Sequence, residues 1–177
     1  YFVYVIDNYF KGKELSGKTV GIVGFGAIGQ SMAKLCLGMG MHVIFCDPEV
    51  DQVTLSWTIG NNTPVSIHLQ STTKEIVLAQ SDYISLHLPN QEKPFLDQDA
   101  FAAVKPGVGI INTARASAID HQALLQALDR DIVSFAGLDV YEDEPNPKLG
   151  ILMHPKLSLT PHIGGSTKEA QSRIGID

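Results

Sequence analysis

The sequence predicts an α/β fold, a doubly wound parallel sheet with helices on both faces. Three observations support this class. Short apolar runs typical of buried strands alternate with segments of helical periodicity along most of the 177 residues. A glycine-rich turn lies where the first strand passes into the first helix. Polar residues follow several strands, at the edge of the sheet where ligands bind in such folds.

Length and composition fit one globular domain. The apolar content of 44% and the charged content of 18% are typical of such domains. The net charge is −6 without a basic cluster, so we expect no nucleic-acid partner. No apolar run reaches the roughly 18 residues that span a membrane, so we expect no membrane partner. Cys36 and Cys46 predict free buried thiols in a reducing, cytoplasmic setting, with a disulfide between them as the alternative.

The glycine-rich turn has the spacing G-x-G-x-x-G, formed by Gly24, Gly26 and Gly29. An apolar strand at residues 19–23 precedes it, and residues 28–39 follow with helical spacing. Glycines in this setting permit a tight turn, a close approach of the main chain to a pyrophosphate, and close packing of helix on strand. The free N–H groups and dipole of the helix N-terminus also favour phosphate. The motif predicts a Rossmann-type dinucleotide site, and a turn without a ligand is the alternative.

A second strand, residues 42–46, ends in Asp47, 18 residues after the last glycine of the motif. This is near the spacing of about 20 at which an acid binds the adenosine ribose hydroxyls. Glu49 and Asp51 follow without a nearby Arg or Lys, so a 2′-phosphate should be repelled. The segment therefore predicts NAD rather than NADP as the cofactor. Pro48 fits the alternative, in which Asp47 is a simple turn residue at a strand end.

The rest of the chain continues the alternation of strands and helices. Residues 1–13 are interpreted as a lead-in, and residues 48–63 as a polar, turn-rich connection. Strands are expected at residues 65–69, as a short edge strand, and at 82–88, 108–113, 132–140 and 157–160. Helices are expected at 72–80, at 97–104 after the cap Asp97, after the cap Asp120, and after a capping box of Ser166 and Glu169. Residues 14–177 are therefore expected to form one domain.

Four side chains with catalytic chemistry follow strands of the predicted sheet. Arg115 follows one strand, Asp139 and Glu144 follow the next, and His162 follows the last. A histidine is suited to take the proton of a hydroxyl as hydride leaves the carbon. A carboxylate beside it orients the imidazole and stabilises its charged form, and an arginine grips a carboxylate with two hydrogen bonds. This set suits the oxidation of a hydroxy acid, and a solvated surface position is the alternative for each residue.

Several runs of this sequence resemble the D-2-hydroxyacid dehydrogenase family. The matching runs are GIVGFGAIG, FCDPE, ISLHLP, INTAR, AGLDVYEDEP and TPHIGGST, which follow the family's order over about residues 14 to 175. The resemblance implies an NAD-dependent oxidoreductase that acts on the CH–OH group of a 2-hydroxy acid and forms a 2-oxo acid. It also implies a site without a metal, a homo-oligomer formed through this domain, and a separate substrate domain that this chain lacks.

The resemblance also implies roles for individual residues. Arg115 matches the family's substrate-binding arginine, His162 its acid–base residue, and Glu144 the partner of that histidine. Asp47 matches the acid that binds the ribose, and Asp139 the acid that contacts the carboxamide. Arg115 and His162 are also expected to contact the nicotinamide end of the cofactor. Further cofactor contacts are expected at Gly24, Gly26, Ala27, Ile28, Gly29, Thr113, Ala114, Ile163, Gly164 and Gly165.

Two departures from the family pattern leave other functions open. Ala116 stands where the family usually has glycine, and a positive φ at this position would make the alanine costly and tilt Arg115. The loop at residues 90–96 lacks the family's usual threonine. A non-catalytic NAD-binding module of the corepressor type and an inactive fragment are the alternatives to an enzyme. The complete set of Arg115, Glu144 and His162 favours the enzyme.

Overall fold

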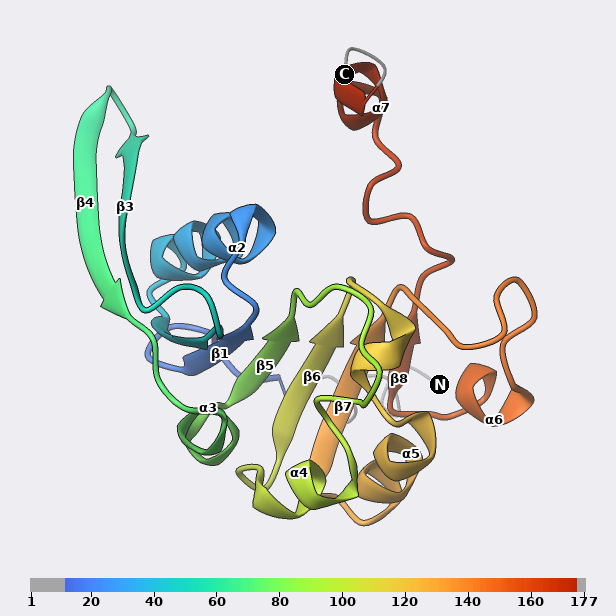
Figure 1. Ribbon diagram of the computed structural model, residues 1–177. Coiled ribbons are helices and arrows are strands. Elements are labelled where there is room, and N and C mark those ends of the chain that lie inside the picture. The colour runs from blue at the N-terminus through green and yellow to red at the C-terminus, as the bar shows by residue number, and fades with distance from the viewer. Residues whose placement is uncertain (1–11, 175–177) are drawn as a thin grey trace, which may run out of the picture.

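A six-stranded sheet forms the centre of the computed structural model, which describes residues 12–174. The strand order is β2-β1-β5-β6-β7-β8, and all neighbouring strands are parallel (Figure 1). The strands are β1 (Thr19–Val23), β2 (His42–Cys46), β5 (Tyr83–Leu86), β6 (Val108–Asn112), β7 (Val133–Leu138) and β8 (Leu157–Leu159). The predicted parallel sheet is confirmed. The strand order reverses between β1 and β5, where ligands bind in open sheets of this kind.

Helices pack on both faces of this sheet. On one face lies α2 (Ala27–Gly38), and on the other lie α3 (Lys74–Gln80), α4 (Gln98–Ala103) and α5 (His121–Asp129) (Figure 1). Alternation along β1 sets this division, because Val20 and Ile22 belong to the core under α2 and Val23 to the core under the other three helices. The doubly wound arrangement is therefore confirmed. Among the described residues no helix is long and apolar enough to cross a bilayer.

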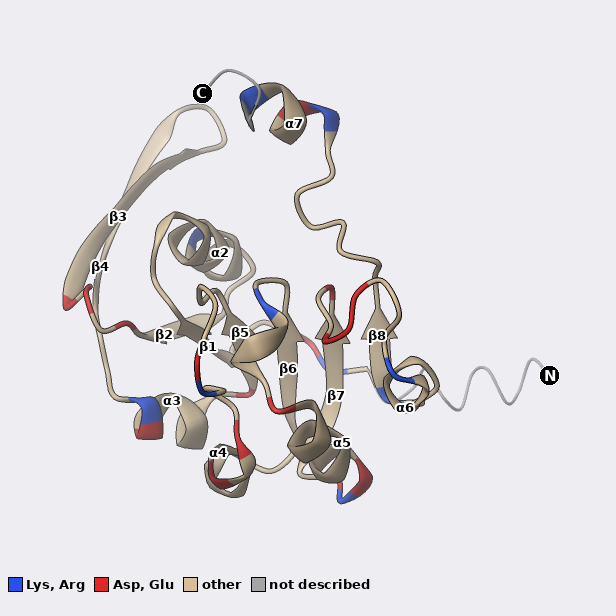
Figure 2. Ribbon diagram, turned by 45° about the vertical axis from the view of Figure 1, so that its right-hand side comes forward, with Lys and Arg blue, Asp and Glu red and all other residues tan. Residues whose placement is uncertain are grey.

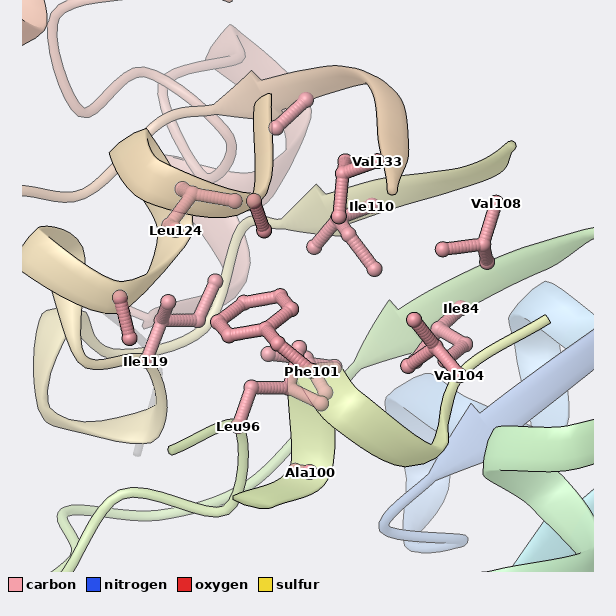
Figure 3. Close-up of a cluster of buried hydrophobic side chains, with 14 of the residues drawn as sticks. Ile84, Leu96, Ala100, Phe101, Val104, Val108, Ile110, Ile119, Leu124 and Val133 are labelled. Carbon is pink, nitrogen blue, oxygen red and sulfur yellow. The ribbon is translucent and has the colours of Figure 1, made fainter. Parts of the chain in front are cut away.

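The larger hydrophobic core lies between the sheet and the helices α3, α4 and α5 (Figure 3). Ile84 and Ile110 contribute from neighbouring central strands, and Phe101 of α4 and Leu124 of α5 pack with them. All four side chains are buried. Burial of side chains of this size stabilises a fold by about 1.5–3 kcal/mol each. Because this core holds β5 and β6, it fixes the strand ends that carry part of the site.

The smaller core lies between β1, β2 and α2. The rings of Phe25 and Phe45 stack there, with their centroids 3.8 Å apart. Cys36 is buried in the same core, and Cys46 is buried at the end of β2. Both cysteines are free thiols, as predicted. Burial raises the pKa of Cys46 to about 11, with a further contribution from the charge of Asp47. This thiol therefore stays protonated at neutral pH.

The segment between β2 and α3 differs most from the predicted elements. We expect a polar connection at residues 48–63, but β3 (Gln52–Ile59) and β4 (Thr63–Gln70) form an antiparallel hairpin outside the sheet. The predicted edge strand at residues 65–69 is part of this hairpin. The run QVTLSWTI alternates polar and apolar residues, and its apolar half, which includes the buried Leu55, packs toward α2. The high polarity of this segment comes from the alternate residues that face away from α2.

The helix caps were predicted with mixed success. Asp97 and Asp120 cap α4 and α5 as expected: Asp97 accepts from one main-chain N–H of the first turn, and Asp120 accepts from two. The capping box of Ser166 and Glu169 is wrong. Thr167 Oγ1 accepts from Ala170 N at 3.1 Å, and α7 (Lys168–Ile174) begins one residue later than that box requires. Figure 1 shows α7, in red, standing clear of the sheet.

Two short helical segments complete the described chain. They are a 3₁₀ helix, η1 (Ala116–Ala118), after β6, and α6 (Leu149–Leu152), before β8. The strand ends also lie slightly earlier than predicted, since β6 ends at Asn112 and β7 at Leu138. The lead-in predicted at residues 1–13 falls almost entirely on residues 1–11, outside the described residues.

Candidate active site

The β1–α2 turn places its three glycines in three different surroundings. Gly24 has a φ of 86°, and its N–H donates to the Cys46 carbonyl at 3.0 Å. A Cβ on Gly29 would lie 2.2 Å from the Gly24 carbonyl oxygen, so only glycine lets α2 approach β1 here. A Cβ on Gly26 would meet no atom within 4 Å apart from its chain neighbours. The fold therefore requires Gly24 and Gly29, whereas Gly26 leaves its main chain open to a ligand.

The N-terminus of α2 is suited to a pyrophosphate. Gly26 is its cap residue, no side chain caps its first N–H groups, and its first turn carries no acidic residue. Ala27 and Ile28 begin the helix at an exposed position, and Ile28 is 70% exposed. Uncapped N–H groups and the positive end of the helix dipole attract phosphate. The residues present therefore fit the phosphates of a dinucleotide.

Asp47 lies directly after β2, and main-chain N–H groups hold its carboxylate beside the turn. Its Oδ2 accepts from Phe25 N at 2.6 Å, and its Oδ1 accepts from Glu49 N and Val50 N at 2.8 and 3.1 Å. A carboxylate has about four acceptor positions, so one remains for a ribose hydroxyl. Its neighbour Glu49 is exposed and adds negative charge. This position fits the predicted ribose acid and opposes a 2′-phosphate.

The chain after β6 positions Arg115. The buried side chain of Asn112 accepts from Ala114 N at 3.1 Å and donates to the Arg115 carbonyl at 2.9 Å. Arg115 is exposed, and its Nη1 donates to the Ala114 carbonyl at 2.6 Å. Ala116 does not have a positive φ, since it opens η1 and the non-glycine residues with positive φ lie elsewhere. The strain that a positive φ would cause at Ala116 is therefore absent. Thr113 and Ala114, directly after β6, lie at the same edge of the sheet as Arg115.

Asp139, directly after β7, organises the loop that carries the histidine. Its Oδ1 accepts from Thr160 Oγ1 at 2.6 Å and from Ile163 N at 2.8 Å, and its Oδ2 accepts from Gly164 N at 2.7 Å. Burial raises the pKa of Asp139, but these hydrogen bonds outweigh burial and leave the pKa below its ordinary value. A Cβ on Gly164 would lie 3.0 Å from Asp139 Oδ2, which explains the glycine. The contact of Asp139 with a carboxamide stays a prediction.

His162 and Glu144 form a hydrogen-bonded pair between the loops after β8 and β7. His162 Nδ1 lies 2.8 Å from Glu144 Oε2, and Glu144 Oε1 accepts from Tyr141 N, also at 2.8 Å. The hydrogen bond from His162, followed by that from Tyr141, holds the pKa of Glu144 below its ordinary value. His162 has a φ of 54°, an uncommon value for a residue with a side chain. Its Nε2 is the ring nitrogen that Glu144 leaves for a substrate.

The three predicted catalytic residues line one open hollow of about 390 Å³. Arg115, Glu144 and His162 belong to its wall. In Figure 2 the red acidic stretch that follows β7 lies at the same edge of the sheet as the blue stretch that follows β6. The hollow therefore combines a cation, a carboxylate and an imidazole. Other members of the wall are Asn90, Ala116, Ser117, Val140, Tyr141 and Glu142.

A larger hollow, of about 740 Å³, lies at the opposite edge of the sheet. Tyr83, Lys105 and Phe135 are among its lining residues, and none of the predicted site residues belongs to it. Gly12, the first described residue of the chain, also lines this hollow. Size alone is therefore a poor guide to the site in this protein.

Sequence reasoning missed the residues that position the predicted ones. Asn112 holds the backbone at Arg115, Thr160 donates to Asp139, and the Tyr141 hydroxyl lies 2.8 and 2.7 Å from the carbonyls of Leu138 and Thr160. A polar residue at the last position of an apolar strand, as in Asn112, is a signal that the sequence offered. The partners of Tyr141 and Thr160 are far apart in sequence, so their pairing carried no such signal.

Fold and site together define a dinucleotide-binding domain that carries an acid–base pair and an arginine beside the strand ends. The chain belongs to the D-isomer-specific 2-hydroxyacid dehydrogenase family, because residues 4–164 match the model of that family's NAD-binding domain. NAD is therefore its cofactor. Both the sequence resemblance and the predicted cofactor are confirmed.

Known proteins similar to this chain are longer dehydrogenases and reductases. The hydroxypyruvate reductase of Thermotoga maritima is 42% identical over 94% of this chain and 52% of its own length. D-3-phosphoglycerate dehydrogenase 3 of Arabidopsis thaliana is 38% identical over 96% of this chain and 28% of its own length. The solved structure of a D-2-hydroxyisocaproate dehydrogenase matches with a TM-score of 0.82 and 32% identity, over 98% of this chain and 54% of that one. The chain thus spans about half, or less, of the length of these proteins.

Proposed function

We propose that residues 14–177 form the coenzyme domain of an NAD-dependent D-2-hydroxyacid dehydrogenase, whose substrate domain lies outside this chain. The observation that carries the proposal is the His162–Glu144 pair, at 2.8 Å, in the same hollow as Arg115. The lengths of the relatives support a second domain. A corepressor-type NAD module would have no need of this complete set.

The three residues divide the work of oxidising a hydroxyl group. NAD, when bound, supplies the hydride acceptor. Arg115 would hold the carboxylate of the substrate with two hydrogen bonds and polarise the adjacent oxygen. His162 would take the hydroxyl proton at Nε2 during oxidation and return it during reduction. Glu144 would keep the imidazole oriented through Nδ1 and stabilise its charged form.

Our first candidate for the substrate is D-3-phosphoglycerate, oxidised to 3-phosphohydroxypyruvate at the start of serine biosynthesis. Several similar proteins are D-3-phosphoglycerate dehydrogenases, including that of Mycobacterium leprae. The second candidate is a small 2-oxo acid such as glyoxylate or hydroxypyruvate. The hollow favours this second class in one respect, because Arg115 is the one cation in its wall and a phosphorylated acid has two anionic ends.

Three lysines in loops have acidic partners of their own. Lys105 pairs with Asp82 at 2.7 Å, and Lys156 binds Asp131 at 2.7 Å. Lys148 lies 3.5 Å from Glu142 and is 70% exposed. A phosphorylated substrate would need a second cation from outside the wall of this hollow, such as one from the missing domain. Such a domain would also exclude water and position the substrate, and misplacement alone can reduce a rate about 100-fold.

The test expresses the complete reading frame that encodes this chain and follows NADH absorbance with 3-phosphohydroxypyruvate, hydroxypyruvate and glyoxylate. Turnover with one of them, abolished in His162→Ala, is the expected result. The isolated chain should bind NADH but show no sustained turnover near the roughly 10 per second that is typical of whole enzymes. Inactivity of the complete protein with all three substrates would contradict the proposal, as would an active His162→Ala variant.

We also propose that the protein forms a homo-oligomer through this domain. The outer face of α2 supports the proposal, because Leu35 is 65% exposed and Met39, directly after the helix, is 45% exposed. Large exposed apolar side chains gathered on one helix are typical of protein interfaces. Light scattering should therefore give a mass above that of one chain, and Leu35→Glu should lower it.

A further inference from the structure

The loop that departs from the family pattern is tied to the segment that carries the active-site arginine. Ser117 of η1 donates from Oγ to Asn90 Oδ1 at 2.9 Å, and the same Oγ accepts from Gln91 N at 3.0 Å. Leu96 pairs with Ile119 a few residues further along both segments. Asn90 and Ser117 are also wall residues of the hollow that contains Arg115. The loop therefore adds a side chain of its own to the candidate substrate site.

The hydrogen bonds of Ser117 show what Asn90 offers there. Ser117 Oγ accepts from Gln91 N and donates its proton to Asn90 Oδ1, which holds the carbonyl end of the amide toward η1. The two N–H groups on Asn90 Nδ2 have no hydrogen-bond partner within residues 12–174, and the side chain is exposed. Held in this way, Asn90 offers donors only, beside a guanidinium that also offers donors only. Donors of this kind suit an anionic or carbonyl oxygen.

We propose that Asn90 is a substrate-specificity residue, which donates from Nδ2 to an oxygen of the 2-oxo or 2-hydroxy acid whose carboxylate Arg115 holds. This inference rests on the proposed function and deepens it. Ser117 is then a positioning residue, because it fixes the orientation of the Asn90 amide without touching the substrate. One arginine and one neutral donor together suit a small acid with a single negative charge. The loop that carries Asn90 would therefore influence which substrate the enzyme accepts.

A purely structural role for Asn90 is distinguishable from this one. The tether to Ser117 uses Oδ1 alone, and Asn90→Asp keeps that acceptor while replacing the N–H groups with a second oxygen. If Asn90 only ties the loop to η1, Asn90→Asp should weaken anion binding only through its added charge, and high salt should remove that loss. If Asn90 serves the substrate, the aspartate removes a donor and places a negative charge beside the anion. Hydrogen bonds to charged groups are worth enough that affinity should fall about tenfold or more.

The experiment uses the protein expressed from the complete reading frame, saturates it with NADH, titrates it with oxamate, an unreactive monoanion shaped like a small 2-oxo acid, and follows amide signals by NMR. We expect the side-chain N–H signals of Asn90 to shift and saturate with the same dissociation constant as signals near Arg115. Asn90→Asp should weaken oxamate binding about tenfold or more, and Ser117→Ala should weaken it less. NADH affinity, measured separately by calorimetry, should be the same in all of these proteins.

The matched control is Asn62→Asp, at the tip of the β3–β4 hairpin. It makes the same chemical change at a position with a φ of 61°, which aspartate tolerates as well as asparagine does. Oxamate binding should not change in this variant. Equal oxamate affinity in Asn90→Asp and the unaltered chain would overturn the assignment of Asn90, as would failure of oxamate to bind the NADH complex. Failure to bind NADH would instead contradict the proposed function itself.

Discussion

The β1–α2 turn and the loops after β7 and β8 lie along the carboxyl edge of one sheet, but they are built in opposite ways. The turn depends on the absence of side chains, since a Cβ on Gly29 would lie 2.2 Å from the Gly24 carbonyl oxygen. The loops depend on side chains, because Asp139 alone accepts three hydrogen bonds that fix the segment around His162. One region is shaped by backbone packing and the other by a polar network.

This difference separates the ways in which the two regions fail. Backbone packing is local and involves residues within a few positions of one another, so an added methyl group should lower the free energy of unfolding. A polar network joins residues far apart in sequence, such as Asp139 and Gly164. Its loss should displace the side chains of the site. Substitutions in the two regions should therefore change different quantities.

The largest effect is expected for Gly29→Ala. The new Cβ would clash with the Gly24 carbonyl oxygen, which is backbone and cannot turn away. Overpacking of this kind should lower the free energy of unfolding by about 3 kcal/mol. Urea unfolding followed by circular dichroism measures it.

Gly26→Ala is the matched control, because its Cβ would occupy open space. Its free energy of unfolding should be unchanged or higher by up to about 1 kcal/mol. Its NADH affinity should fall, because the methyl group stands where the pyrophosphate approaches the main chain. Equal destabilisation by the two alanines would contradict the distinction between the glycines.

Asp139→Asn should produce the next largest effect. The amide nitrogen would face an N–H donor on whichever side it lies, either Gly164 N or Ile163 N. Loss of charged hydrogen bonds by a buried residue should cost about 2 kcal/mol of unfolding free energy. It should also separate His162 from Glu144, which an NMR titration of the histidine ring would detect. Retention of both stability and the histidine signal would show that Asp139 does not organise this loop.

Asp47→Ala tests the cofactor end of the site. The carboxylate offers one remaining acceptor to a ribose hydroxyl and repels a 2′-phosphate. NADH affinity should fall by about 1.5 kcal/mol, and the difference between NADH and NADPH should narrow. Calorimetric titration of both cofactors provides the comparison. If the unaltered chain binds both equally, Asp47 does not select between them.

Glu144→Gln should have the smallest effect on stability, because its contact with His162 is partly solvated and screened. The folded protein lowers the pKa of Glu144 through hydrogen bonds from His162 and Tyr141. A lowered pKa stabilises the fold above the unfolded value, about 4.3, and this contribution is lost as the pH falls through the folded value. Urea midpoints of the two proteins should therefore differ slightly near neutrality and converge below about pH 4.3. A difference that persists well below pH 4.3 would contradict a lowered pKa of Glu144.

The turn was predictable from sequence because its signals are local. The spacing of Gly24, Gly26 and Gly29, the flanking strand and helix, and Asp47 after the second strand all lie within 29 residues, from Thr19 to Asp47. The positions of Arg115, Glu144 and His162 after strands also followed from a parallel sheet. Hydrogen-bond partners did not, because the Thr160–Asp139 and Ser117–Asn90 bonds join side chains that only the folded chain brings together.

The β3–β4 hairpin was missed for a different reason. Its alternating pattern was visible in residues 52–59, but its polar half was interpreted as a loop composition. Packing of Leu55 and its neighbours toward α2 stabilises strands, rather than a loop, in this segment. A two-residue period is thus a stronger signal than mean polarity in a segment beside an amphipathic helix.

One NMR experiment tests most directly whether the turn and the polar loops serve a single ligand. The chain is titrated with NADH and, separately, with ADP-ribose, which lacks the nicotinamide ring. Both ligands should shift the main-chain amides of Gly26, Ala27 and Ile28. NADH alone should also shift those of Arg115 and Ile163, because the nicotinamide end should reach the hollow lined by Arg115 and His162. Shifts confined to the turn with both ligands, or absent from it with NADH, would contradict this arrangement.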